Sequence, residues 1–347
     1  MATDSRGRLC SFPPSIFAAV MGTGIFSVSS LYYSEYFPFL RFLSLALLYF
    51  NTVLFFVLLV PWAGRWFLCR EDSLRDLTDP VKSSFYPTIA ISLLVLSSSY
   101  IVILGDISLG MLFWFVGVVL TVFFAILIPY IMFGGTHVRI DHINPAWCIP
   151  PVGLIVIPVA GARIMSMFTG LIHDAILLLN VFGWGAGFFL YISLSAVCMY
   201  RFLLHRPLPN TLAPTIWINL GPIGVGIISL LSIGKVSAIP SCFGTLTFLA
   251  LLLWGYGLWW LFMAIVMTLH YLRKLSLPYA LSWWAFTFPL GAYAASTYLL
   301  AHTVSNGVIG VAGFFIYLLL AFLWSLTAFK SAAALVRGLR DNAIKDR

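Results

Sequence analysis

The segment Ser282 to Ser296, SWWAFTFPLGAYAAS, places large aromatic rings, a proline and several small residues inside one apolar run. Phe288 follows Pro278 by ten residues, which puts its ring roughly 15 Å along a helix and near the middle of a bilayer about 30 Å thick. Pro289 removes a backbone donor, and the small residues after it let the helix bend and approach its neighbours. One interpretation, which the residues alone do not favour, is a ring that blocks a passage at mid-membrane. The alternative is a ring that only packs against a neighbouring helix or lipid.

Residue types that could catalyse a reaction are sparse and poorly grouped. His137, Asp141 and His142 lie in THVRIDH without a third ligand in a defined metal motif, and His173 beside Asp174 is equally isolated. HExxH, GxSxG, Walker and Rossmann patterns do not occur in a usable context. The sequence therefore predicts no enzyme activity, no metal site and no cofactor.

The cysteines also indicate no metal or disulfide framework. They contain no CxxC pair, and several fall near the side that we interpret as cytoplasmic and reducing. We expect them to act as small apolar residues: Cys10, Cys69, Cys148, Cys198 and Cys242.

Composition identifies the broad class of the protein. Hydrophobic residues make up 61% of the 347 residues, charged residues 9%, and mean hydropathy is +1.02. Apolar runs of about 20 residues recur along the chain, and in lipid each must form a helix to satisfy its backbone. We predict an all-α membrane protein with a single transmembrane domain over residues 1–347. Its ten expected helices span about 12–33, 37–60, 80–104, 107–133, 145–168, 174–204, 213–233, 241–271, 278–302 and 307–328.

The basic residues predict the orientation of these helices. Of the 19 lysines and arginines, only Arg41, Arg163 and Lys235 would lie on the side opposite the N-terminus. The positive-inside rule then places both termini in the cytoplasm. We expect the membrane to be the plasma membrane. The net charge of +8 is thus a topology signal, and no nucleic-acid partner is expected.

Prolines recur at the cytoplasmic start of every odd-numbered helix, at intervals of 64 to 69 residues: Pro13, Pro80, Pro145, Pro214 and Pro278. This interval fits one helical hairpin, so the chain is interpreted as five hairpins. Further prolines lie deeper in odd helices, and we expect Pro87, Pro151, Pro222 and Pro289 to line the pore. Odd helices are also rich in small residues, whereas even helices are bulky and lipid-like. We expect the odd helices to line a central pore, although small residues can also serve helix packing alone.

Ionisable residues are missing from the predicted helix centres, where an ion-coupled carrier usually keeps one. This favours passive permeation, while coupling through a protonated substrate stays open. Arg163 and Lys235 at outer helix ends could raise the local anion concentration at the mouth. They could equally be anchors that reach to the membrane surface.

Four segments carry a resemblance to a known family: FPPSIFAAVMGTG, DPVKSSFYP, WGYG and above all WWAFTFPLG. Together they resemble the tellurite-resistance/dicarboxylate transporter family, which includes bacterial tellurite-resistance channels, plant slow-type anion channels, fungal malate permeases and sulfite exporters. The likeness covers essentially the entire chain.

The resemblance implies ten helices as five hairpins with quasi-fivefold symmetry, inner odd helices around a pore, and a homotrimer with one pore per subunit. It implies that Phe288 plugs the pore and that Ala18 and Gly22 face its ring. The leading hypothesis is passive permeation of small anions of the chloride, nitrate, malate and sulfite class. The alternative is proton-linked transport of C4-dicarboxylates (malate) or of sulfite.

Overall fold

The protein is built from helices. The computed structural model describes residues 7, 9–135, 138–236 and 240–345, and in these ranges it contains helices and no strand. Nine helical segments of the described chain are long and apolar enough to cross a membrane. The predicted class, an all-α membrane protein, is confirmed. The count of ten spans and the fivefold symmetry stay predictions.

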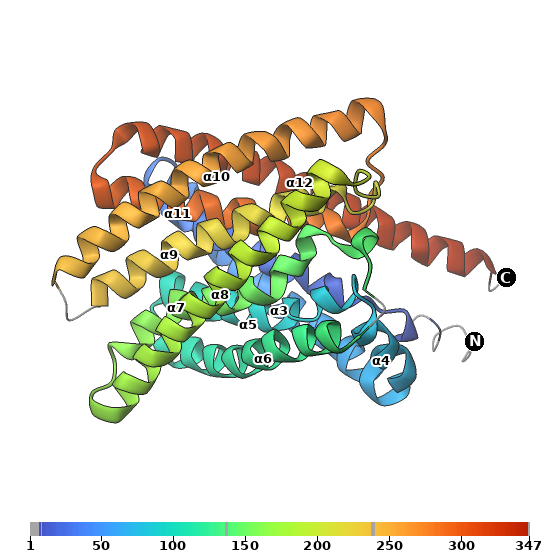
Figure 1. Cartoon of the computed structure of the whole chain (residues 1–347), viewed down its shortest axis with the longest axis horizontal. Coiled ribbons are helices and arrows are strands. Elements are labelled where there is room, and N and C mark those ends of the chain that lie inside the picture. Colours follow the sequence, from blue (N-terminus) through green and yellow to red (C-terminus); the bar gives the residue numbers. More distant parts are fainter. Residues whose placement is uncertain (1–6, 8, 136–137, 237–239, 346–347) are drawn as a thin grey trace.

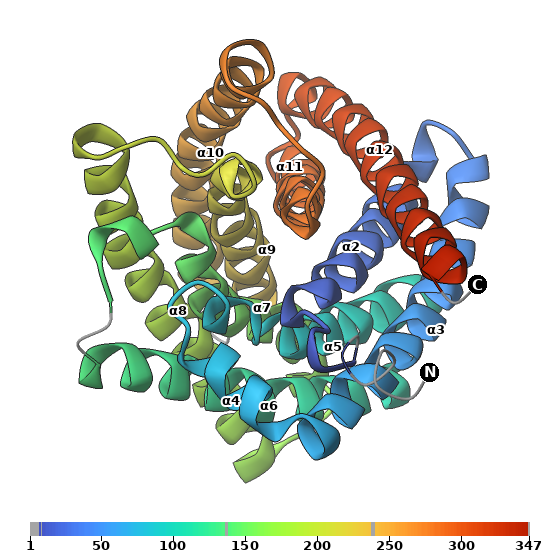
Figure 2. The same cartoon turned by 90° about the vertical axis from the view of Figure 1, so that its right-hand side faces the viewer.

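The helices form an inner and an outer layer (Figure 2). The inner helices are α2 (Ala18–Tyr32), α5 (Thr88–Ser99), α7 (Ile149–Met165), α9 (Leu220–Val236) and α11 (Phe288–Val304). The outer helices are α3 (Phe39–Leu68), α6 (Ile107–Gly134), α8 (Gly170–Leu204), α10 (Pro240–Lys274) and α12 (Gly307–Lys345). The spans that contain α2, α5, α7 and α9 are 72% to 89% buried, whereas the outer spans are 28% to 39% buried. The small-residue helices are therefore the central ones.

The inner helices make a closed ring of contacts. Helix α2 packs against α5, α5 against α7, α7 against α9, and α9 against α11. Helix α11 then packs against α2, which joins the last part of the chain to the first. Figure 1 shows the inner and outer helices running roughly side by side along the long axis of the molecule. A ring of this kind can enclose a path along its centre.

Each inner α-helix follows a short 3₁₀ segment. These segments are η1 (Pro14–Phe17), η3 (Ser83–Phe85), η6 (Pro145–Cys148), η7 (Ala213–Asn219) and η8 (Leu281–Phe286). Prolines stand in the first turn of η1, η6 and η7. A first turn tolerates proline because its N–H would have no intrahelical acceptor there. Of the prolines that repeat in the sequence, Pro145 and Pro214 stand in such a first turn and Pro13 is the N-cap of η1, whereas Pro80 and Pro278 lie three residues before η3 and η8.

One small helix lies outside the spans. Helix α4 (Arg70–Thr78) follows α3 and is attached to it by an ion pair between Arg65 and Asp76. Lys82 forms a second ion pair with Asp76, at 2.7 Å. Burial alone would raise the pKa of the Asp76 carboxyl, but the hydrogen bonds from Lys82 and Arg65 hold it below its usual value. This cluster ties α4 to the end of α3.

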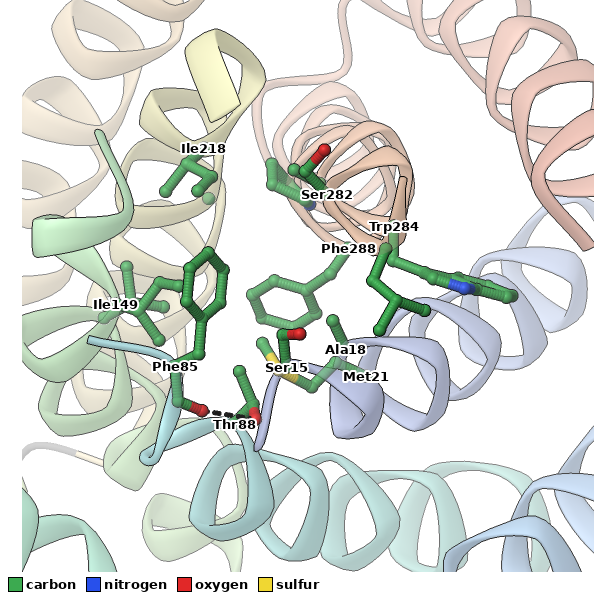
Figure 3. A pocket seen from close by; sticks show the side chains of 15 residues that line it. Ser15, Ala18, Met21, Phe85, Thr88, Ile149, Ile218, Ser282, Trp284 and Phe288 are labelled. Carbon is green, nitrogen blue, oxygen red and sulfur yellow. Dashed lines mark hydrogen bonds between the residues drawn. The ribbon is translucent and has the colours of Figure 1, made fainter. Parts of the chain in front are cut away.

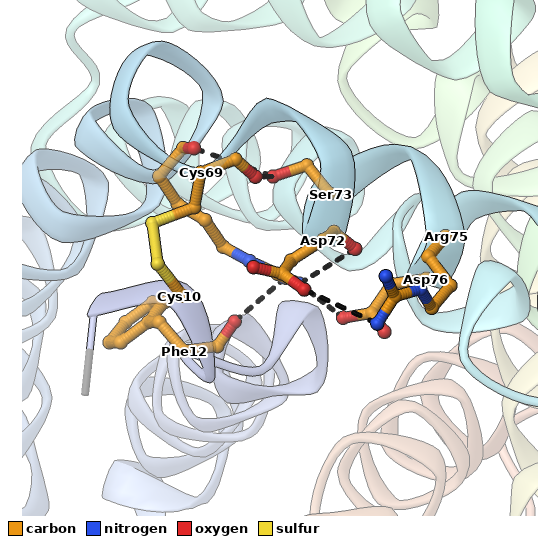
Figure 4. Close-up of a disulfide and its surroundings, with 8 residues drawn as sticks. Cys10, Phe12, Cys69, Asp72, Ser73, Arg75 and Asp76 are labelled. Carbon is orange, nitrogen blue, oxygen red and sulfur yellow. Dashed lines mark hydrogen bonds and ion pairs between the residues drawn. A yellow bond between two sulfur atoms is a disulfide. The ribbon is translucent and has the colours of Figure 1, made fainter. Parts of the chain in front are cut away.

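Cys10 and Cys69 form a disulfide, which corrects our expectation that the cysteines do not pair (Figure 4). The two residues are 59 positions apart, so no short-range motif marks them. Arg65 donates a 2.9 Å hydrogen bond to the Phe12 carbonyl and so helps to hold the N-terminal segment against the end of α3. Cys148, Cys198 and Cys242 are free thiols. No group of three or more potential metal ligands occurs in the described ranges.

Candidate permeation path

Phe288 owes its position to a break in the last inner span. The 3₁₀ segment η8 ends at Phe286, and α11 begins at Phe288 with Pro289 in its first turn. Thr287 lies between them, and its hydroxyl donates a 2.8 Å hydrogen bond to the Trp284 carbonyl. The Gly291 N–H donates to the Thr287 carbonyl at 2.8 Å, which starts the α-helical pattern. The aromatic side chain is thus carried at the first position of a helix inside the ring.

A small cavity of about 40 Å³ lies among the N-terminal parts of the inner spans; we call it the N-side cavity. Figure 3 shows the Phe288 ring pointing into it, among side chains from several inner spans. Its lining includes Ala18 and Met21 of α2, Thr88 at the start of α5, Ile149 at the start of α7, and Gly221 of α9. The α-helical part of every inner span therefore begins beside this cavity.

A second cavity of about 40 Å³, the C-side cavity, lies further along the same helices. Its lining is mainly apolar and includes Ile25, Val95, Val156 and Val225, one from each of four inner helices. Ala295 of α11 completes the ring around it. Each cavity has room for only a few water molecules.

Phe288 is the residue that the linings of the two cavities share. Its side chain is only 4% exposed. It lies close to α9, because a Cβ added at Gly221 would be 3.8 Å from Phe288 Cε1. The ring therefore stands between the N-side and C-side cavities.

Of the small positions expected to face that ring, Ala18 lines the N-side cavity. Gly22 contacts the break itself, since a Cβ there would lie 2.0 Å from Thr287 Oγ1 and 3.2 Å from the Trp284 ring. Among the predicted pore-lining prolines, Pro289 lines the N-side cavity.

The other predicted prolines are buried away from the two cavity linings. Pro87 is the N-cap residue of α5, and Pro151 lies in the first turn of α7. The Pro151 carbonyl faces α8, where an added Cβ on Gly187 would be 2.7 Å from it. Pro222 is buried in α9. The structure thus places these three prolines at helix starts and helix contacts.

The cavities contain no charged side chain: none of their lining residues is Asp, Glu, Lys, Arg or His. Arg163 and Lys235 are exposed in the last turns of the neighbouring helices α7 and α9. At the same ends of α2 and α11, Glu35 and His302 are 3.2 Å apart. Charged groups therefore lie at the C-terminal ends of the inner helices rather than along the path.

The described residues of the THVRIDH segment are held by local hydrogen bonds. His137 lies outside the described residues. Asp141 is hydrogen-bonded at 2.6 Å to His205. The hydrogen bond from His205 is the main reason that the pKa of the Asp141 carboxyl lies below its usual value. The Arg139 N–H donates a 3.3 Å hydrogen bond to His142 Nδ1, which closes the short turn η5 (Ile140–His142).

Sequence reasoning did not single out most of the cavity lining. In α2 and its flanking turns the lining residues are Ser15, Ala18, Met21, Ile25, Val28 and Tyr32. They are spaced three or four residues apart, which is one face of a helix. A search for residues three or four positions apart, starting at Ala18, would cover these positions. Inner helices are buried on every side, however, so their other faces are equally apolar and the spacing does not distinguish the cavity face.

A comparison with protein families matches residues 11–332 to the voltage-dependent anion channel family, SLAC1. The chain belongs to this family. The predicted resemblance is confirmed, because the relatives named below include a sulfite pump and a malate transporter of the group to which the motifs pointed.

Several curated members of the family are similar to this chain. An uncharacterized transporter of Methanocaldococcus jannaschii is 50% identical over 328 residues, which is 94% of this chain and 94% of that protein. A sulfite efflux pump of Arthroderma otae is 24% identical over 94% of this chain and 93% of its own length. A malic acid transport protein of Schizosaccharomyces pombe is 22% identical over 61% of this chain and 52% of its own length. The chain is thus an anion transporter of this family, and these relatives are transporters rather than enzymes.

Substitution of Gly22 tests the contact that positions Phe288. Gly22→Ala places a methyl group against Thr287 Oγ1 and should lower stability by about 1–3 kcal/mol, as overpacking usually does. Gly185→Ala is the matched control, because a Cβ there meets nothing within 4 Å. Thermal unfolding of the purified variants gives the melting temperature of each. Equal melting temperatures for Gly22→Ala and the parent would contradict the close packing of α2 on the break.

Proposed function

We propose that the chain conducts small anions passively along the centre of the inner ring, and that Phe288 is the gate that closes this path. The anions belong to the chloride, nitrate, malate and sulfite class. The observation that carries the proposal is the place of Phe288 in the lining of both central cavities. The cavities follow one another along the same helices and would join if the ring moved aside.

The lining supports a passive pathway. A carrier that couples transport to protons or sodium usually needs an ionisable residue within the membrane. No such residue lines the two cavities. Charge on a permeating ion would instead be met by backbone dipoles and by hydroxyl groups such as those of Ser15 and Ser282.

The helix ends favour anions over cations. The α-helical parts of the inner spans begin beside the N-side cavity, at Ala18, Thr88, Ile149, Leu220 and Phe288. The N-terminal end of a helix carries a partial positive charge. Several such ends around one small cavity stabilise a negative ion without any charged side chain.

Arg163 and Lys235 extend this preference to the outer mouth. Arg163 follows the lining residue Val156 by seven positions, and Lys235 follows the lining residue Ile228 by seven. Seven residues are close to two helical turns, so each basic residue continues the cavity face of its helix. We propose that both raise the local anion concentration there.

We further propose that the protein acts as a homotrimer with one path per subunit in the plasma membrane, with both termini in the cytoplasm. The trimer follows from the family resemblance alone. The orientation follows from the basic residues of the sequence.

Phe288→Ala should raise anion conductance strongly. Loss of the ring joins the two cavities, and a lowering of the barrier by about 1.4 kcal/mol already gives a tenfold rate. The measurement is chloride and nitrate current in planar bilayers or oocytes, corrected for the amount of protein in the membrane.

Phe286→Ala provides the matched control. Phe286 is a buried ring two residues away that contacts Trp217 and Trp283, and it lines neither cavity. Its removal should leave the current near the parent level. If Phe288→Ala leaves the current unchanged, or if both variants raise it equally, Phe288 is not the gate.

A second function is proton-linked transport of sulfite or malate. The names of two relatives, a sulfite efflux pump and a malic acid transport protein, supply the two substrates of this alternative. Proteoliposomes that hold a pH gradient at zero membrane potential separate it from a channel. We expect uptake of labelled sulfite and malate to follow an imposed potential and to ignore the pH gradient. Accumulation driven by the pH gradient alone would establish the carrier in place of the channel.

A further inference from the structure

A groove on the outside of the inner ring lies between the outer helices α8 and α10. Its volume is about 320 Å³, which makes it much larger than either central cavity. Trp259, Met263 and Met267 of α10 form one wall, Met199 and Leu203 of α8 form the other, and Ile216 of η7 closes the inner side. Methionine side chains are flexible and adapt to occupants of irregular shape.

The groove is elongated along α10. Its α10 wall runs through Trp259, Met263, Met267 and Tyr271, which are spaced four residues apart and share one helix face. Twelve residues of helix cover about 18 Å. The groove therefore runs from near the C-terminal end of α10 to about the middle of this helix, and an acyl chain can lie along it.

One end of the groove is basic. Arg206 lines it, is exposed, and has no carboxylate within ion-pair distance in the described part of the chain. The nearby acid, Asp141, is already bonded to His205. Arg273 and Lys274 are exposed at the same end of α10. This is the end that the positive-inside rule places at the cytoplasmic leaflet, whose anionic lipids attract such residues.

We propose that this groove is a binding site for one anionic phospholipid. One acyl chain lies along the methionine and tryptophan wall, and the phosphate of the headgroup is bound by Arg206. A narrow apolar groove with an unpaired guanidinium at its water-facing end matches a lipid in shape and in charge. The site does not depend on conduction or on Phe288, so it can fail while the proposed function holds.

Native mass spectrometry of the purified full-length protein tests the site with dioleoylphosphatidylglycerol and dioleoylphosphatidylcholine as probes. The parent protein should retain one phosphatidylglycerol per chain in preference to phosphatidylcholine. Arg206→Gln should weaken phosphatidylglycerol retention about fivefold, the effect of one basic contact at a membrane surface, and should leave phosphatidylcholine unchanged. Arg273→Gln is the matched control, because Arg273 is at the same end of α10 but outside the groove lining.

A groove-filling substitution tests the apolar part. Met263→Trp should abolish the retained lipid, whereas Val266→Trp, at an exposed α10 residue outside the lining, should not. Equal losses for Arg206→Gln and Arg273→Gln would show only a diffuse basic edge and overturn the headgroup site. Lipid retention by Met263→Trp would place the lipid elsewhere. Crosslinking of Met263→Cys between subunits by a short bismaleimide would show that a second copy of the chain covers the groove, which also overturns the proposal.

Discussion

The central arrangement depends on the contact between Gly22 of α2 and Thr287 at the break before α11. This contact joins the first and last inner helices and leaves no room for a side chain at Gly22. The same break interrupts the last span and puts Phe288 at the first position of a new helix, pointing into the N-side cavity. The same contact therefore closes the ring of inner helices and positions the Phe288 side chain.

The electrostatic properties of the path depend on the helices that surround it. The outer helices expose apolar side chains on their outward faces and cover the inner helices. The interior can then contain 3₁₀ turns and helix starts, because irregular backbone is tolerated in a membrane only where protein or a water-filled cavity surrounds it. Those helix starts supply positive dipole ends at the N-side cavity. In the proposed permeation, such a path offers an anion electrostatic stabilisation and no strong binding charge.

The sequence predicted the class, the family and the inner helices because these depend on local properties. Hydropathy marks apolar spans, and proline with small residues marks the central ones. It could not predict the Cys10–Cys69 disulfide, which depends on the N-terminal segment returning to the end of α3. It could not show that Gly22 contacts Thr287, or that Pro87 lies at a helix start instead of a cavity wall. Helix α12 continues to Lys345, although its apolar pattern ends near residue 328. Hydropathy predicts only the part of a helix that lies in the membrane, so it did not show where this helix ends.

The most direct test is the accessibility of single cysteines on the two sides of Phe288. In protein without its free thiols, Ala18→Cys and Val225→Cys place one thiol in the N-side and one in the C-side cavity. A small thiol-reactive anion, dicyanoaurate, is added to one face of oriented proteoliposomes, and alkylation followed by mass spectrometry reports which thiol each face reaches. We predict that reagent added to one face protects only the thiol in the cavity on that side while Phe288 is present. Once Phe288→Ala is introduced, the same reagent should protect both thiols. Access to both thiols from one face with Phe288 intact would contradict the central claim.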